Sequence, residues 1–210
     1  MSRIDFYTKV HKALRASLFQ LSRRAASVDC RDLQAVRACA DALRGLLERL
    51  SAHARHEASF IHPLLAEKTG SSPFDADHRT LEEEQARLVG LLDSVSALPE
   101  AERNTRGLTF YRALNLFIAR YLEHLDREEA AMPVLWERCS DEELRSVMVR
   151  FGASRPLGEA LADIGWMLPA LNAPEQAELV GGMAAALNQG ESCAPTGRPS
   201  LSSTQPRTTR

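Results

Sequence analysis

Apolar residues recur at helical spacing along four long segments of the chain, and this periodicity limits the fold more than any other feature. The segments span about residues 4–25, 31–68, 74–97 and 104–138. Gly70 and Pro73 end the second segment, and Pro99 lies in a predicted loop before the fourth. No segment alternates with period two, so we expect no strands. The pattern predicts an all-α fold, with an antiparallel up-down-up-down four-helix bundle over residues 1–139.

The sequence changes character after the fourth segment. Ser140 and Glu143 form the capping-box pattern of a helix start, and two further helical stretches follow. We expect residues 140–188 to form accessory helices that pack on the bundle or make a subunit contact in a homo-oligomer. From residue 189 to residue 210, Pro, Ser, Thr and Arg dominate, which predicts a disordered tail.

Each predicted bundle helix carries one histidine on its apolar stripe, and the second and fourth helices add a glutamate one turn later. A lone histidine on such a stripe is more often a hydrogen-bonded core residue than a ligand. A buried carboxylate, however, costs several kcal/mol unless it is paired or bound to a metal. No lysine or arginine shares these stripes. We therefore predict a metal site formed by His11, His53, Glu57, His78, His124 and Glu128.

The predicted ligands are also expected to lie at one level of the bundle. His11 and His78 come early in their helices, whereas His53 and His124 come late, so antiparallel packing brings all four to one end. The chain repeats this pattern in its two halves, each with a histidine followed by a His-x-x-x-Glu motif. Two matching half-sites favour two metal ions.

The ligand types suggest which metals and which small molecules could bind. Four imidazoles and two bridging carboxylates would give each ion two nitrogens and two oxygens. A shared oxo or hydroxo group would still leave an open position, which suits dioxygen, nitric oxide or peroxide. Mixed nitrogen and oxygen donors without thiolate favour iron, manganese or zinc.

At these six residues the chain resembles the hemerythrin-like, or HHE cation-binding, family over about residues 4–138. The resemblance implies a four-helix bundle with a non-haem di-iron centre. It also implies roles in oxygen binding or sensing, nitric oxide or redox response, iron handling, or iron-sulfur repair. The oxygen-carrying hemerythrins have an extra histidine in helix three, where this chain has Phe74, and an aspartate in helix four, where it has Glu128. These differences favour the bacterial group with four histidines and two glutamates.

Four further side chains lie near the predicted ligands and are candidates for a supporting role: Tyr7, His56, His62 and Tyr121. His56 falls on the flank of its helix, where it is either exposed or a support for the site. His62 precedes Pro63, where the helix must loosen, and is a candidate fifth imidazole. The two tyrosines each precede a ligand histidine by one turn. Their phenols either pack in the core, or donate to a metal-bound ligand, or carry redox equivalents.

The composition argues against several other classes of protein. A net charge of −2 gives no electrostatic basis for binding nucleic acid. No apolar run is long enough to span a membrane, and the N-terminus lacks the apolar core of a signal peptide. The cysteines are scattered without a CxxC pair, which is typical of reduced thiols in a cytoplasmic protein; they are Cys30, Cys39, Cys139 and Cys193.

Three functions are compatible with these observations. The first is a cytoplasmic di-iron protein that binds a small ligand such as dioxygen, nitric oxide or peroxide for sensing, buffering or iron handling. The second is a di-iron redox enzyme, either an oxidase or peroxidase or a nitric-oxide-linked iron-sulfur repair protein, which would use the same ligands with turnover. The third is a metal-free bundle that serves as an interaction module. Whether the protein is an enzyme is left open by the sequence.

Overall fold

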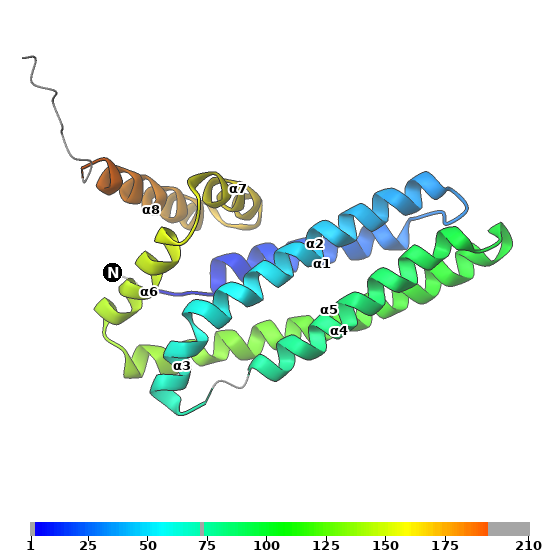
Figure 1. Ribbon diagram of the computed structural model, residues 1–210. Coiled ribbons are helices and arrows are strands. Elements are labelled where there is room, and N and C mark those ends of the chain that lie inside the picture. Colours follow the sequence, from blue (N-terminus) through cyan, green and yellow to red (C-terminus); the bar gives the residue numbers. More distant parts are fainter. Residues whose placement is uncertain (1–2, 72–73, 193–210) are drawn as a thin grey trace, which may run out of the picture. The chain divides into compact units, whose positions relative to one another are not determined.

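The computed structural model describes residues 3–71 and 74–192, and every regular element among them is helical. α1 packs on α2 and α5, and α4 packs on the same two helices, so each long helix has two neighbours (Figure 1). The prediction of an all-helical fold is confirmed for the described residues. The long helices are α1 (Thr8–Ala26), α2 (Leu33–Phe60), α4 (Phe74–Asp93, followed by the 3-10 helix η1, Ser94–Ala97) and α5 (Glu100–Arg138).

Two buried apolar clusters lie inside this arrangement. The larger one follows the leucine stripes of the four helices, because residues three or four apart face inward together. The smaller one contains Tyr7, Leu65, Phe74, Met132, Leu135, Cys139 and Leu144. Along α1, His11 falls between Tyr7 of the smaller cluster and Leu14 of the larger one. The polar residues of the stripes therefore form a layer between the two clusters.

The second predicted helix is interrupted near its end. We expected one helix over residues 31–68, but α2 ends at Phe60 and α3 (His62–Thr69) follows it. Pro63 explains the break, because proline has no backbone N–H to donate and is best tolerated in the first turn of a helix. Gly70 then ends α3 with a φ of 85°, a conformation that glycine adopts without strain.

Two helix starts also differ from the prediction. α1 begins at Thr8 rather than near residue 4, because the Asp5 carboxylate accepts hydrogen bonds from the backbone N–H groups of Tyr7 and Thr8, at 2.8 and 2.9 Å. α5 begins at Glu100, where we expected a loop up to about residue 104. Pro99 directly precedes this first turn, where its fixed φ is compatible with a helix start.

Further helices follow the four long ones. α6 (Asp141–Ala153) begins with a complete capping box, in which the Ser140 hydroxyl accepts from the Glu143 N–H and the Glu143 carboxylate accepts from the Ser140 N–H. α7 (Leu157–Met167) and the 3-10 helix η2 (Leu168–Ala170) come next. α6 packs on α2, whereas α7 and η2 pack on α1. All of these belong to one compact unit with the long helices, which ends at Leu171.

A second compact unit begins at Asn172 and contains α8 (Ala173–Ser192). Residues 189–192, which we expected in a disordered tail, are helical, and residues 193–210 of that predicted tail lie outside the described residues. Cys193 lies outside them as well, while Cys30, Cys39 and Cys139 are buried free thiols. In the described part of the chain, no helix combines the length and the apolar character needed to cross a membrane.

Replacing Ser140 by alanine is expected to destabilise α6 by about 1 kcal/mol, because the helix loses its side-chain N-cap. Amide hydrogen exchange in α6 measures this effect. Ser140→Thr is the matched control, since it retains the capping hydroxyl. Equal protection of α6 in the alanine and threonine variants would show that the cap does not hold the helix.

Candidate metal centre

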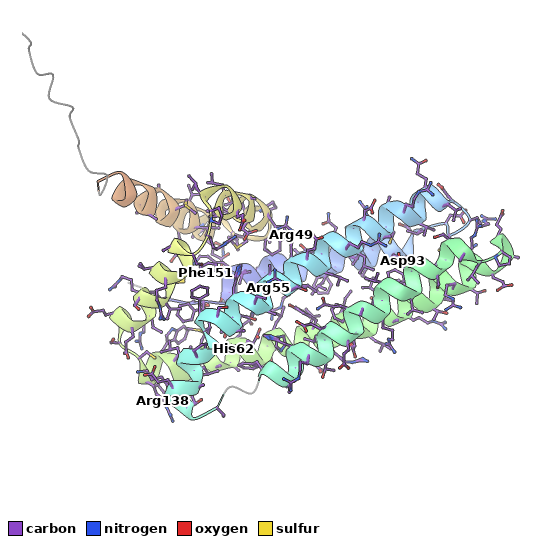
Figure 2. All side chains as sticks on the ribbon, viewed as in Figure 1. Arg49, Arg55, His62, Asp93, Arg138 and Phe151 are labelled. Atoms are coloured by element: carbon purple, nitrogen blue, oxygen red, sulfur yellow. The ribbon has the colours of Figure 1, made fainter. Side chains whose placement is uncertain are left out.

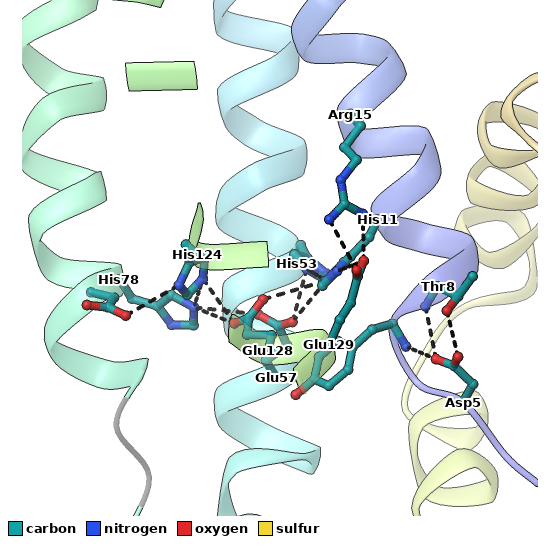
Figure 3. Close-up of polar contacts among 12 residues, drawn as sticks. Asp5, Thr8, His11, Arg15, His53, Glu57, His78, His124, Glu128 and Glu129 are labelled. Atoms are coloured by element: carbon teal, nitrogen blue, oxygen red, sulfur yellow. Dashed lines mark hydrogen bonds and ion pairs between the residues drawn. The ribbon is translucent and has the colours of Figure 1, made fainter. Parts of the chain in front are cut away.

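Six side chains from the four long helices meet between the two apolar clusters (Figure 3). They are the residues that the stripes predicted as ligands: His11, His53, Glu57, His78, His124 and Glu128. Their donor atoms fall into two groups of four that share both glutamates, and within each group all donor atoms lie within 4.8 Å of one another. The structure brings every predicted ligand into one cluster.

Half-site A consists of His11 and His53 with one oxygen from each glutamate. The Nε2 atoms of the two histidines are 3.1 Å apart. Glu57 Oε1 lies 3.0 Å from His53 Nε2 and 3.8 Å from His11 Nε2. Glu128 Oε2 lies 3.6 Å from His11 Nε2.

Half-site B consists of His78 and His124 with the other oxygen from each glutamate. The Nε2 atoms of these histidines are 3.0 Å apart. Glu128 Oε1 lies 3.0 Å from His124 Nε2 and 3.4 Å from His78 Nε2. Glu57 Oε2 lies 3.5 Å from His78 Nε2. Each half-site therefore presents two imidazole nitrogens and two carboxylate oxygens.

The two glutamates connect the half-sites, because each turns a different oxygen toward each of them. Donor atoms bound at about 2.1 Å to one ion lie about 3 Å apart when they are adjacent, so the spacing in both half-sites is compatible with a shared ion. The four oxygens of Glu57 and Glu128 are buried and accept no hydrogen bond of normal geometry. Buried acceptors need partners, and two cations would satisfy all four. The donor set therefore fits two metal ions.

Burial controls the protonation of the cluster. Removal from water, together with the negative charge of Glu128, raises the pKa of Glu57 to about 7. Burial also acts to raise the pKa of Glu128, but the rings of His124 and His78 hold it below its ordinary value. Burial lowers the pKa of His53 to about 4, so its imidazole is neutral and able to coordinate a metal.

A third glutamate, which the sequence analysis did not single out, orients His11. Glu129 Oε1 accepts a hydrogen bond from His11 Nδ1 at 2.9 Å, and Arg15 donates to the same oxygen at 2.5 Å. These contacts with His11 and Arg15 lower the pKa of Glu129 to about 2, so it remains charged. With the proton held on Nδ1, Nε2 of His11 is left to face half-site A.

Asp77 lies beside half-site B as Glu129 lies beside half-site A, but its contact with the histidine is longer. Asp77 Oδ2 lies 3.6 Å from His124 Nδ1 and 2.8 Å from Arg127 Nη2. Like Glu129, Asp77 is next to a predicted ligand in the sequence. A position one residue away points about 100° around the helix, toward a neighbouring helix. An acid at such a position is the signal that could have identified both residues.

The two tyrosines lie beside the cluster and are buried. The ring centroid of Tyr7 is 5.0 Å from that of His11, and the Tyr121 ring is 5.8 Å from that of His124. Burial and the nearby carboxylates raise the pKa of both phenols, so both remain protonated. Tyr7 Oη is buried and has no hydrogen-bond partner among the described residues.

The remaining two histidines differ in position. His62, at the start of α3, is buried, and its ring stacks on His78 with a centroid distance of 5.2 Å and an interplanar angle of 23°. It contacts a histidine of half-site B but does not belong to either group of donor atoms. His56 is half-buried, and its ring lies 5.0 Å from that of Phe151 of α6. Figure 2 labels Phe151 and His62. His56 packs between helices rather than on the cluster.

Comparison with known families agrees with this arrangement. The family model described as Hemerythrin HHE cation binding domain matches residues 2–135, a range that includes every residue of both half-sites. The match covers more than half of the chain. Neither the curated proteins nor the solved structures give a match.

Replacing Glu57 by glutamine is expected to stabilise the metal-free protein by an amount on the order of 1 kcal/mol, because it removes one of two adjacent buried carboxylates. Urea unfolding in the presence of EDTA measures the change. Glu123→Gln, at an exposed position of α5, is the control and should change stability by less than about 0.5 kcal/mol. A loss of stability in Glu57→Gln would mean that the histidines fully compensate the carboxylate without metal.

Proposed function

Because the chain belongs to the hemerythrin HHE cation-binding domain family, we propose that it is a non-haem di-iron protein that binds a small ligand such as dioxygen, nitric oxide or peroxide for sensing, buffering or iron handling. The observation that carries this proposal is that both glutamates offer one oxygen to each half-site. Shared carboxylates of this kind suit two adjacent ions rather than one. The packing of α1, α2, α4 and α5 supports the antiparallel up-down-up-down order that the short connections predict.

In this proposal each ion has two imidazoles and shares two carboxylates. Half-site A would use His11 and His53, and half-site B would use His78 and His124. Nitrogen and oxygen donors without thiolate suit iron, with manganese or zinc as alternatives. Cys139 is buried in the smaller apolar cluster and belongs to neither group of donors.

Metal ions held by the histidines and glutamates of the two half-sites would supply an open coordination position and reversible electron transfer. The protein supplies orientation and a dry environment. The Glu129 carboxylate keeps the proton of His11 on Nδ1. Apolar side chains lie on both sides of the polar layer and exclude water from it. The Tyr7 hydroxyl, buried and protonated, is available to donate a hydrogen bond to a small ligand at the centre.

The buried phenols also favour a second candidate, a di-iron redox enzyme acting as an oxidase, a peroxidase or a nitric-oxide-linked iron-sulfur repair protein. Tyr7 and Tyr121 each contact a histidine of a different half-site, where a phenol can carry redox equivalents. Catalytic consumption of a reductant distinguishes this candidate, because a sensor or buffer binds and releases its ligand without turnover.

We place this function in the cytoplasm, a location that the buried free thiols support. Homo-oligomer formation through the accessory helices is a further part of the proposal. Leu157 and Leu161, both on α7, are each 49% exposed, which supports a subunit contact at that helix.

Metal analysis of anaerobically purified protein, combined with its optical spectrum, tests the proposed centre. We expect close to two irons per chain, one for each half-site, and an absorption band of an oxo-bridged ferric pair after oxidation. A double His53→Ala, His124→Ala variant should lose both signals, whereas Arg55→Ala, an exposed control on the same helix as His53, should retain them. Wild-type protein that binds no stoichiometric metal would overturn the proposal and favour the metal-free interaction module.

Tyr7→Phe is expected to weaken the binding of azide to the diferric protein about fivefold, because the loss of one hydrogen bond costs about 1 kcal/mol. Spectroscopic titration with azide measures the affinity. Phe19→Leu, at an exposed position of the same helix, is the control and should leave the affinity unchanged. Unchanged azide affinity in Tyr7→Phe would limit the role of Tyr7 to packing.

A further inference from the structure

A surface pocket lies beside the centre, between α3, α4 and α5. Its volume is about 330 Å³, and its walls include Leu65 of α3, Phe74 of α4, and Arg127 and Ala130 of α5. The walls are mostly apolar, with Arg127 as the cationic side chain among the lining residues. None of the lining residues is a donor of either half-site.

Two residues that line this pocket connect it to half-site B: Phe74 contacts His124, and Arg127 pairs with Asp77. The ring of Phe74 lies 6.0 Å from that of His124, edge to face, so it separates the pocket from this half-site. Arg127 pairs with Asp77 at 2.8 Å, and Asp77 in turn faces His124 Nδ1. The pocket is therefore one aromatic ring away from half-site B.

The two half-sites also differ in the contact that a neighbouring acid makes with one histidine of each. In half-site A, Glu129 accepts a hydrogen bond from His11 Nδ1 at 2.9 Å. In half-site B, Asp77 Oδ2 lies 3.6 Å from His124 Nδ1, which is longer than a hydrogen bond. Burial is similar in the two half-sites, because each has one histidine that is 0–1% exposed and one that is 9–11% exposed. An acid at a longer distance orients the ring of a ligand histidine less well. Loss of such a hydrogen bond to a metal-binding histidine typically changes metal affinity by about 10- to 100-fold.

We propose that this pocket is the entry route to the centre, with Phe74 as its inner wall, and that half-site B is the exchanging half that metal ions and small ligands reach first. Half-site A is then the retained half. This inference rests on the proposed di-iron function. It assigns to Phe74 a role in access, and to Asp77 and Glu129 the difference between the two half-sites.

Release of iron to a chelator tests the route. Protein loaded anaerobically with Fe²⁺ is mixed with ferrozine, and the coloured complex is followed with time. We expect one fast and one slow phase per chain. Ala130→Phe fills the pocket from an exposed position and should slow the fast phase about tenfold, whereas Phe74→Ala should accelerate it.

Ala119→Phe is the matched control, because Ala119 is exposed on the same helix but does not line the pocket. It should leave both phases unchanged. General loosening of the fold would accelerate release in every variant, so slower release in Ala130→Phe cannot arise from damage. Equal rates in wild type, Ala130→Phe and Ala119→Phe would overturn the entry route.

Single-ion variants test which half-site exchanges. His53→Ala leaves half-site B intact, and its remaining iron should be released in the fast phase, slowed by Ala130→Phe. His78→Ala leaves half-site A intact, and its iron should be released slowly and without sensitivity to Ala130→Phe. The reverse assignment would overturn the inference alone, whereas wild-type protein that binds no iron would overturn the proposed function itself.

Discussion

Two carboxylates buried side by side between apolar clusters are the constraint on which the rest of this structure depends. Among the described residues, the side chains that pair with Glu57 and Glu128 are histidines. Arg15 pairs with Glu129 instead, and Arg127 pairs with Asp77. The inner carboxylates are thus left to pair with cations, and the histidines around them offer nitrogen donors of the type that such cations bind. A cation bound there would remove the cost of burying the pair, which would link metal binding to folding.

The central cluster was predictable because helix geometry alone determines most of it. Residues four apart share a face, so His53 with Glu57 and His124 with Glu128 could be paired from spacing. Glu129 was harder to predict, because it lies off the stripe and matters only through the angle at which α1 approaches α5. The break after Phe60 was only partly predictable. Pro63 indicated that the helix is distorted nearby. Pro133, however, lies inside a continuous α5, so a proline by itself does not decide where a helix ends.

α6 and α7 contact the two helices that form one side of the centre, α1 and α2. Trp166 Nε1 of α7 donates to Ser17 of α1 at 3.0 Å, and Arg49 of α2 lies 4.8 Å above the same indole ring. Phe151 of α6 packs against His56, which is adjacent in sequence to Glu57. These contacts fix α1 and α2, the helices that supply both histidines of half-site A. α6 and α7 therefore support the helices of half-site A, even though they contribute no donor to it.

The two halves of the chain repeat the same ligand motif, but the structure surrounds them differently. In the first half, α2 ends at Phe60 and α3 begins with Pro63 in its first turn, and Leu65 and Thr69 of α3 form part of the pocket next to half-site B. In the second half, α5 continues past Pro133 and forms the opposite wall. The break after Phe60 thus places α3 beside half-site B, to which α2 contributes only Glu57. A symmetric set of ligands acquires in this way one half-site that is held by neighbouring helices and one that faces a pocket.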